Sequence, residues 1–312
     1  MQVGVTVPNV HETLAQPGTI SAIARCAEQR GFASLWTNDH VAIPAAPAGV
    51  AGGSTPAYAA RYGEQRGQLL YEPLITLAYL AAITERVQLG TSVYLLALRH
   101  PVLAAKQVVS LDALSGGRVI FGIGVGWLEA EYAAVGVPWR QRGARTDEAL
   151  EVLRTLCSND VAGFEGRHYR FAELEFLPKP AQRTHLPIWI GGRSEAAMRR
   201  AARLGDAWHP SHLTCDELRR VVPELHRECE RVGRAPQDVT VTSRRRLLRG
   251  ARAEPSDEGR VLEGTPEEIR AMLAELEDAG VTHLIVEVPG ASEAEVLENL
   301  DWLGREVLDA NA

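Results

Sequence analysis

Asp39 and His40 are the first neighbouring residues in the chain whose types suggest chemistry. They follow the apolar stretch Ala33–Thr37, which we predict to be a β-strand, so both would be fixed on rigid backbone at the strand's carboxyl end. A histidine can give or take a proton at neutral pH, and a neighbouring carboxylate can orient it. Hydrogen-bonded structural histidines carry the same pair, so the pair alone leaves a catalytic and a structural role open.

A second chemical candidate is a turn between a predicted strand and a predicted helix, with the sequence Gly191-Gly192-Arg193-Ser194. Free N–H groups at a helix N-terminus, a guanidinium and a hydroxyl can together bind a phosphate. An ordinary glycine turn with Ser194 as the helix N-cap would use the same residues. The turn therefore indicates either a phosphate site or a plain helix start.

Alternate glycines occupy the stretch VIFGIGVGW, at positions Gly122, Gly124 and Gly126. We predict that a strand ends near Phe121, and that the glycines leave its carboxyl end accessible to a flat ligand. Their GxGxG spacing differs from the GxGxxG of dinucleotide-binding loops, so we expect a different kind of site. The alternative is that the glycines only allow strands and helices to pack closely.

A metal site is not expected. His209 and His212 lie three residues apart after a predicted strand, but no third ligand lies near them in the sequence. The cysteines are widely separated, contain no CxxC pair and are expected to be reduced thiols. They are Cys26, Cys157, Cys215 and Cys229.

Short apolar stretches alternate with helix-like ones along the whole chain. The predicted strands are Val3–Val7, Ala33–Thr37, Val87–Ser92, Val119–Phe121, Leu186–Ile190, Asp206–His209, Val239–Arg245 and His283–Val288. Because no linker or change of composition interrupts the alternation, we predict a single (β/α)8 barrel over residues 1–312 rather than an open doubly wound sheet. Sites in such barrels lie at the carboxyl ends of the strands, where all of these candidates fall.

Two stretches depart from the alternation. The segment from Ile43 to about Leu70 follows the second strand and is rich in Ala, Pro, Gly and Ser, so we predict a long loop near the site. The segment Ser158–His185 precedes the fifth strand and is predicted to be an irregular insertion with a short hairpin.

The composition is that of an ordinary globular protein, with 46% hydrophobic and 23% charged residues. A formal net charge of −7 argues against nucleic acid or an anionic membrane surface as the main partner, and favours a small molecule. No apolar stretch approaches the length of a membrane span, and the N-terminus enters a predicted strand without a leader. We therefore expect a cytoplasmic protein.

Taken together, these stretches resemble the bacterial luciferase-like superfamily, and within it the branch of coenzyme F420-dependent oxidoreductases. The resemblance covers essentially the whole chain. It rests on Trp36-Thr37-Asn38-Asp39-His40, Leu89–Val93, Arg99-His100-Pro101, Leu114–Arg118, Gly122–Trp127, Pro187–Ser194 and Gly205-Asp206-Ala207-Trp208.

The resemblance implies a barrel with a flavin or deazaflavin across the carboxyl ends of the strands. It also implies a non-prolyl cis peptide bond at Ser92-Val93 behind the ring, and places Asp39 and His40 near the reactive face. The residues it implies for cofactor binding are Ser92, Val93, Gly124, Gly126, Gly191, Gly192, Arg193, Ser194, Trp208 and His209.

The chain departs from the sugar-phosphate dehydrogenases of that branch. Trp127 stands where those enzymes carry an acid, and no lysine lies near Ser211 to help bind phosphate. Their general acid and substrate are therefore not transferred. Glu129 and Glu131 are nearby acids, and a solvent-facing position on a short helix would explain them equally well.

Three functions follow from this resemblance. The leading hypothesis is hydride transfer between F420 and an organic substrate, with His40 in proton transfer and Asp39 orienting it or contacting the ring. The second is an FMN-dependent monooxygenase of the same superfamily, and the third is a non-catalytic flavin-binding barrel. Barrels of this family commonly pair, so we also expect a homodimer, to which Leu77, Leu80 and Ala81 could contribute an apolar face.

Overall fold

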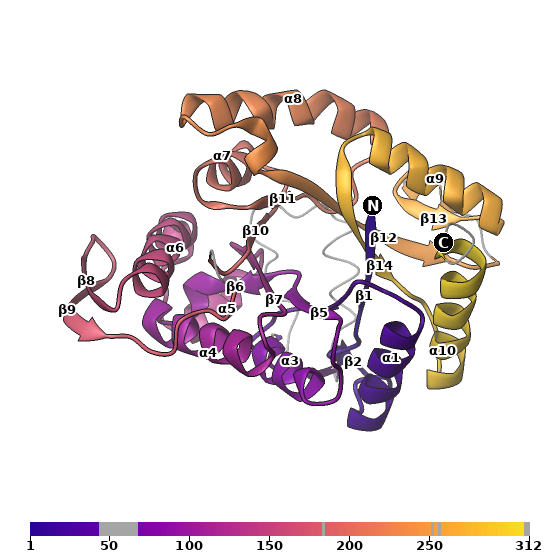
Figure 1. Cartoon of the computed structure of the whole chain (residues 1–312), viewed down its shortest axis with the longest axis horizontal. Coiled ribbons are helices and arrows are strands. Elements are labelled where there is room, and N and C mark those ends of the chain that lie inside the picture. The colour runs from indigo at the N-terminus through magenta and orange to yellow at the C-terminus, as the bar shows by residue number, and fades with distance from the viewer. Residues whose placement is uncertain (44–67, 183–184, 251–252, 255–256, 309–312) are drawn as a thin grey trace.

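Eight parallel strands form a closed barrel in the computed structural model, which describes residues 1–43, 68–182, 185–250, 253–254 and 257–308 (Figure 1). The strands are β1 (Gln2–Thr6), β3 (Ser34–Thr37), β5 (Gln88–Thr91), β7 (Val119–Gly124), β10 (Ile188–Gly191), β11 (Ala207–His209), β12 (Thr240–Leu248) and β14 (Val281–Glu287). Each pairs with the next in this order, and β14 pairs with β1 to close the barrel. The predicted (β/α)8 fold is confirmed.

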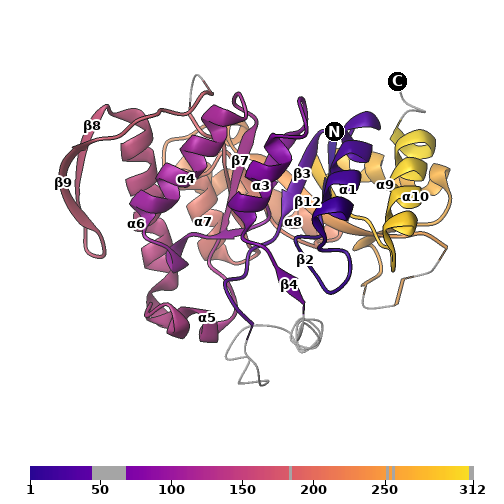
Figure 2. The same ribbon diagram turned by 90° about the horizontal axis from the view of Figure 1, so that it is seen from below.

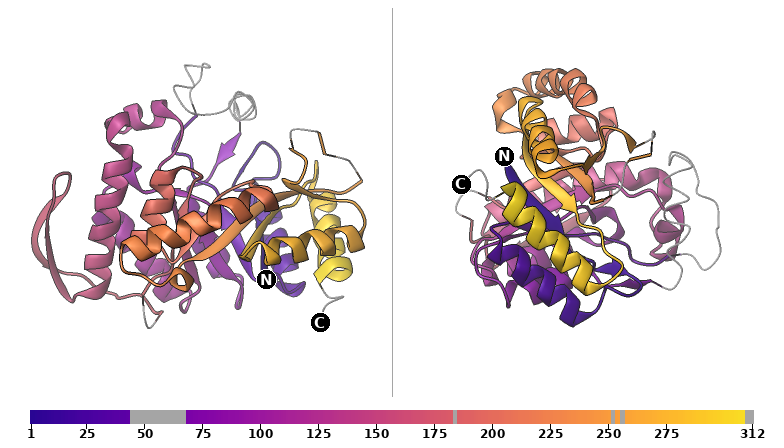
Figure 3. Two further views of the ribbon diagram at one scale, coloured as in Figure 1. Left: turned by 90° about the horizontal axis from the view of Figure 1, so that it is seen from above. Right: turned by 90° about the vertical axis from the view of Figure 1, so that its right-hand side faces the viewer.

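Helices surround the strands on all sides (Figures 1 and 3). They are α1 (Pro17–Gln29), α3 (Pro73–Ala81), α4 (Pro101–Leu114), α6 (Arg142–Ser158), α7 (Glu195–Leu204), α8 (Cys215–Arg231), α9 (Pro266–Asp278) and α10 (Glu293–Trp302), with a short α5 (Glu129–Ala134) after β7. The helix α10 continues as a π-helical segment, Leu303–Leu308.

Local sequence sets the helix starts. Proline occupies the first helical position of α1, α3, α4 and α9, where a missing N–H costs nothing. The predicted capping box of α9 is present, with Thr265 and Glu268 satisfying each other's backbone N–H groups. A second capping box at α8, formed by Thr214 and Glu217, was not anticipated.

Aromatic and aliphatic side chains fill the barrel interior, in a cluster of Trp36, Ile120, Trp189, Ala207 and Ile285. A much larger apolar cluster occupies the layer between the strands and the helices. The interior is therefore a packed core, as in barrels of this size, and not a channel for a ligand.

The carboxyl-end face of the barrel carries additional elements (Figure 2). The short strand β2 (Val10–His11) pairs antiparallel with β4 (Leu69–Leu70). Two further short strands extend the sheet, β6 (Tyr94–Leu95) beside β7 and β13 (Val261–Glu263) beside β12. Of the predicted loop after the second strand, residues 44–67 lie outside the described residues, and its last two residues form β4.

The insertion before the fifth barrel strand contains the predicted hairpin. Its strands are β8 (Val161–Glu165) and β9 (Arg170–Glu175), and it extends outward from the barrel beside α6 (Figure 3). Glu148 on α6 accepts hydrogen bonds from the N–H groups of His168 and Tyr169, each at 2.7 Å, and this fastens the turn to the helix.

The apolar face that we predict on α3 for a homodimer packs in part inside the chain itself. Leu77 and Leu80 are fully buried within the core of the chain itself, so that prediction is wrong for these two residues. The helix instead exposes Ile75 and Tyr79, on its opposite side. Among the described residues, no helix is long and apolar enough to cross a membrane.

Candidate active site

A cavity of about 410 Å³ opens at the carboxyl ends of the barrel strands. Apart from Trp208, every predicted site residue lines it, from His40 after β3 to His209 at the end of β11. Trp208 is fully buried, and its Nε1 donates a 2.9 Å hydrogen bond to the carbonyl of Gly192. Trp208 therefore supports the turn after β10 rather than contacting a ligand.

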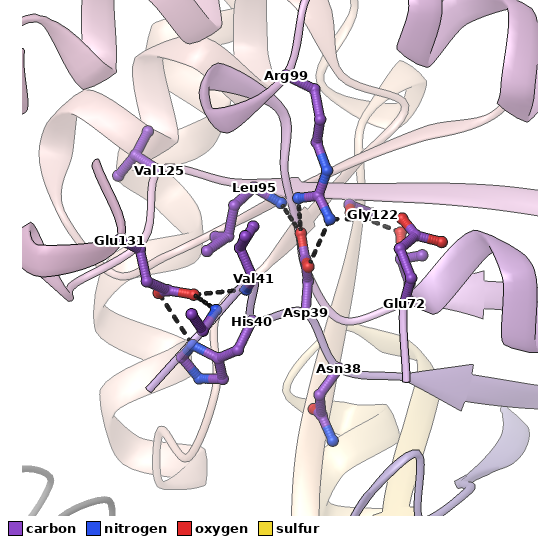
Figure 4. Close-up of polar contacts among 12 residues, drawn as sticks. Asn38, Asp39, His40, Val41, Glu72, Leu95, Arg99, Gly122, Val125 and Glu131 are labelled. Atoms are coloured by element: carbon purple, nitrogen blue, oxygen red, sulfur yellow. Dashed lines mark hydrogen bonds and ion pairs between the residues drawn. The ribbon is translucent and has the colours of Figure 1, made fainter. Parts of the chain in front are cut away.

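His40 is paired with Glu131, and not with Asp39 (Figure 4). Its Nδ1 lies 3.0 Å from Glu131 Oε2, and the two side chains are only 7% and 1% exposed. The other carboxylate oxygen of Glu131 accepts backbone hydrogen bonds from Val41 at 2.6 Å and Ala42 at 3.3 Å. The carboxylate is thus fixed on both oxygens and can hold the imidazole in one orientation.

The buried position of Glu131 contradicts the alternative of a solvent-facing acid. Its neighbour Tyr132 is also fully buried, and the Tyr132 hydroxyl donates a 2.7 Å hydrogen bond to the carbonyl of Val125 in the cavity wall. These consecutive residues fasten α5 across the strand ends. Helical periodicity could not show this, because α5 has only six residues.

Asp39 forms an ion pair with Arg99, so it does not orient His40 as one prediction had it, while its contact with a bound ring stays a prediction (Figure 4). The carboxylate accepts two hydrogen bonds from the guanidinium and a third from the N–H of Leu95, at 2.8 Å. The Arg99 guanidinium also lies 4.2 Å from the centre of the Tyr94 ring. Burial alone would lower the pKa of Arg99, but Asp39 outweighs burial and raises it. Asp39 thus ties the end of β3 to the segment after β5.

Asn9 fixes the same stretch from the other side. Its side-chain amide is completely buried, donates to the carbonyl of Asn38 at 2.8 Å and accepts from the N–H of Asn38 at 2.9 Å. The side chain of Asn9 therefore fixes the backbone of Asn38, and this positions the residues that follow β3 at the cavity.

The peptide bond between Ser92 and Val93 is cis, as predicted. Both residues line the cavity. A Cβ atom on Gly124 would lie 2.3 Å from the Val93 side chain, and one on Gly191 would lie 2.6 Å from it. These two glycines therefore make room for Val93 and not for an open ledge.

The remaining glycines of that run also serve packing. A Cβ atom on Gly122 would lie 1.9 Å from the carbonyl oxygen of Thr91, and Gly126 has a φ of +66°. The alternative of close strand packing is therefore supported at these positions, and because Gly124 and Gly126 also line the cavity, their contact with a ligand stays a prediction. The cavity wall at this point is the apolar side chain of Val93.

A series of buried hydrogen bonds leads from Ser92 away from the cavity. Its hydroxyl lies 3.0 Å from His209 Nε2, and His209 Nδ1 lies 2.6 Å from the hydroxyl of Thr242. Thr242 can donate in turn to the carbonyl of Trp208, at 3.4 Å. A neutral His209 with its proton on Nδ1 satisfies every group in this series.

Burial, reinforced by the nearby Arg244 charge, lowers the pKa of His209 to about 3. A second histidine of the barrel interior, His283, has a pKa lowered to about 4 by burial alone. His283 lies 2.8 Å from the Ser34 hydroxyl, which also accepts from the Trp36 indole N–H at 2.6 Å. Both histidines are therefore neutral at physiological pH.

The turn after β10 presents its polar groups to the cavity. Ser194 is the N-cap of α7, where its hydroxyl accepts from the N–H of Ala197 at 3.2 Å. Arg193 is exposed and makes no hydrogen bond or ion pair with the other described residues. Both interpretations of the turn thus have a structural basis, since a capped helix start also leaves Arg193 available to an anion.

Among the described residues, no group of three or more His, Cys, Asp or Glu side chains is placed to hold a metal ion. His209 and His212 both line the cavity, but His209 uses its ring nitrogens on Ser92 and Thr242.

Comparison with known protein families identifies the family of this chain. The sequence model of the luciferase-like monooxygenase family matches residues 1–258. The chain belongs to the luciferase-like monooxygenase family. An uncharacterized protein of Mycobacterium tuberculosis is 34% identical over 226 residues, which cover 71% of this chain and 75% of that protein.

Two relatives that are similar to this chain differ in the coenzyme that they are named for. The F420-dependent glucose-6-phosphate dehydrogenase of Kineococcus radiotolerans is 27% identical over 325 residues, covering 90% of each chain. The FMNH(2)-dependent dimethylsulfone monooxygenase of Pseudomonas putida is 33% identical over 138 residues, covering 43% of this chain and 38% of that one.

Solved structures share the barrel fold of this chain. An F420-dependent secondary alcohol dehydrogenase superimposes with a TM-score of 0.80 and 17% identity, over 100% of this chain and 99% of that one. The monooxygenase RslO1 of Streptomyces bottropensis gives 0.79 and 22% identity, over 100% of both chains. At these identities the likeness shows the fold alone.

The two buried histidines of this luciferase-like barrel predict a pH-dependent stability. Their pKa values are about 3 and 4 in the folded chain and about 6.5 when unfolded, so only the unfolded state gains protons as pH falls below 6.5. Each should lower the free energy of unfolding by about 2 kcal/mol between pH 7.5 and pH 5. Urea unfolding at both pH values measures the loss, and His283→Gln should remove about half of it. Equal unfolding free energies at the two pH values would show that both histidines titrate normally.

Proposed function

We propose that this protein is an oxidoreductase that moves a hydride between coenzyme F420 and an organic substrate. The observation that carries the proposal is the buried pair of His40 and Glu131 at the wall of the cavity. When bound, F420 accepts or supplies a hydride, and the protein must then take the proton that leaves the substrate's hydroxyl or give a proton to its carbonyl oxygen. The F420-dependent relative that matches this chain over 90% of its length supports the choice of coenzyme.

His40 would carry that proton. Its Nδ1 is held by Glu131 Oε2, so Nε2 is the ring atom at which a substrate proton would be exchanged. Glu131 is a positioning residue in this scheme, because it orients the ring and stabilises the imidazolium when His40 takes up a proton. Trp127 packs against the edge of the imidazole with ring centres 5.8 Å apart, which further restricts its orientation.

The residues around the cavity fit a coenzyme with a flat ring and a phosphate. Val93 offers an apolar surface to a ring, and the buried polar groups of Ser92 and His209 lie directly beneath it. Arg193 and the N-terminus of α7 offer a positive charge and backbone donors to a phosphate.

Replacing Arg193 with Ala should weaken coenzyme binding about tenfold at low salt, because one charge-assisted hydrogen bond to the phosphate is lost. The loss should shrink at high salt. Arg199→Ala is the matched control, since Arg199 lies one turn further along α7 in an exposed pair with Glu195. Fluorescence titration measures both variants. Unchanged affinity for Arg193→Ala at low salt would place the phosphate elsewhere.

An FMN-dependent monooxygenase is the second candidate. The FMNH(2)-dependent relative favours it, and the phosphate donors of the turn after β10 would suit FMN equally well. Titrating the purified protein with F420 and with FMN separates the two. We expect tighter binding of F420, and binding of FMN alone would overturn the proposed coenzyme.

A further inference from the structure

Arg244 on β12 is held rigidly beneath the cavity. Its Nη1 donates to Asn38 Oδ1 at 2.8 Å and to the carbonyl of Ser92 at 3.1 Å, and it lies 3.3 Å from the Ser92 hydroxyl. Its Nε lies 2.6 Å from a carboxylate oxygen of Glu287, and both side chains are 14% exposed. Contacts from three barrel strands or their ends therefore fix this guanidinium.

One part of the Arg244 guanidinium is not used by these contacts. Its Nη2 donates no hydrogen bond to any other residue in the described part of the chain, whereas Nη1 donates to Asn38 and Ser92 and Nε lies against the Glu287 carboxylate. Arg244 also lines the cavity. Nη2 is also not fully enclosed by protein, so it can donate a hydrogen bond to a ligand atom in the cavity.

The contact with Ser92 indicates which ligand atom that is. Ser92 precedes the cis peptide bond, and Val93 follows it as the apolar wall on which we place the ring. A ring that packs on Val93 would lie beside the guanidinium of Arg244, which donates a hydrogen bond to the Ser92 carbonyl. Glu287 balances the charge of Arg244, so the guanidinium acts mainly through its directed N–H groups.

Reduction changes the charge of such a ring. A hydride brings two electrons and one proton, so the ring gains one negative charge unless it takes up a further proton. We propose that Arg244 Nη2 donates to the oxygen or nitrogen of the bound ring that gains this charge, and so makes the protein bind the reduced coenzyme more tightly than the oxidised one. This inference rests on the proposed function and adds a residue that adjusts the reduction potential of the coenzyme.

The adjacent arginines offer a matched control. Arg246 follows on the same strand and pairs with Asp257 at 2.9 Å, and it does not line the cavity. Replacing Arg246 removes one arginine from the same sequence run without touching the cavity wall.

The test is the affinity for oxidised and for reduced F420, measured under anaerobic conditions for the wild type, Arg244→Met, Arg244→Lys and Arg246→Met. Arg244→Met should lower the preference for reduced F420 about tenfold, which corresponds to a potential about 30 mV more negative for a two-electron couple. Arg244→Lys should recover part of the preference, and Arg246→Met should leave it unchanged.

If Arg244→Met bound oxidised and reduced F420 more weakly by the same factor, the inference would be overturned. A purely structural role of Arg244 would change both affinities together. A failure of the proposed function is distinguishable. If the wild type binds FMN and not F420, the coenzyme assignment fails, while the same ratio measured with oxidised and reduced FMN still decides the role of Arg244. Should Arg244→Met not fold, Arg244→Lys against the wild type decides, and an unchanged ratio in a folded Lys variant counts against the inference.

Discussion

Replacing His40 with Asn should lower turnover by about two to four orders of magnitude, the usual contribution of a general acid or base. Asn is close in size to part of the imidazole and can still donate to Glu131, so the melting temperature and the affinity for F420 should stay near wild type. The expected pattern is a loss of kcat without loss of binding. Steady-state kinetics with any accepted substrate, together with thermal melts, measure it.

Glu131→Gln provides the companion measurement. A neutral amide can keep the contact with His40 but cannot stabilise the imidazolium, so kcat should fall by less than in His40→Asn and its pH profile should change. Turnover within a few-fold of wild type for His40→Asn would show that His40 is a packing residue and that the proton comes from elsewhere. A loss of turnover explained by unfolding would lead to the same conclusion.

Replacing Asp39 with Asn should destabilise the fold by about 3 kcal/mol, because it leaves the largely buried Arg99 without its carboxylate partner. The effect should appear as a lower unfolding free energy in urea, in the presence or absence of coenzyme. Glu195→Gln, which breaks the exposed pair with Arg199, should lower the free energy of unfolding by about 0.5 kcal/mol at most.

Comparing Asp39→Asn with His40→Asn separates the roles of the two residues. If Asp39 oriented the imidazole, Asp39→Asn would lower kcat at unchanged stability, as His40→Asn is expected to do. The ion pair with Arg99 instead predicts that Asp39→Asn loses stability, and that it loses activity only because part of the protein unfolds. A stable and inactive Asp39→Asn protein would restore the catalytic role assigned from the sequence.

The sequence predicted the barrel well because its signals are local. Buried parallel strands are short apolar stretches, and glycine, proline and capping residues mark the helix ends, so each barrel strand was placed to within a few residues. The capping box at Thr265 shows how directly such signals translate into structure. The buried face of α3 was misassigned because an apolar stripe shows that a face is covered, and not by what.

The site was less predictable because its contacts join residues far apart in the chain. Glu131 is 91 residues from His40, and Arg99 is 60 residues from Asp39. Both pairs depend on the loops after the strands, whose course periodicity does not determine. The alternate glycines show a further limit, since the sequence does not reveal that Gly124 makes room for the side chain of Val93.

Hydride transfer with F420 is tested most directly by turnover measured with and without dioxygen. The purified protein would be mixed with reduced F420 and a panel of aldehydes, ketones and activated alkenes, and with oxidised F420 and a panel of alcohols, while the F420 absorbance is followed. We expect the F420 absorbance to change with at least one compound, at the same rate with or without dioxygen, and this change to be abolished in His40→Asn. Product formation only with reduced FMN and dioxygen would contradict it.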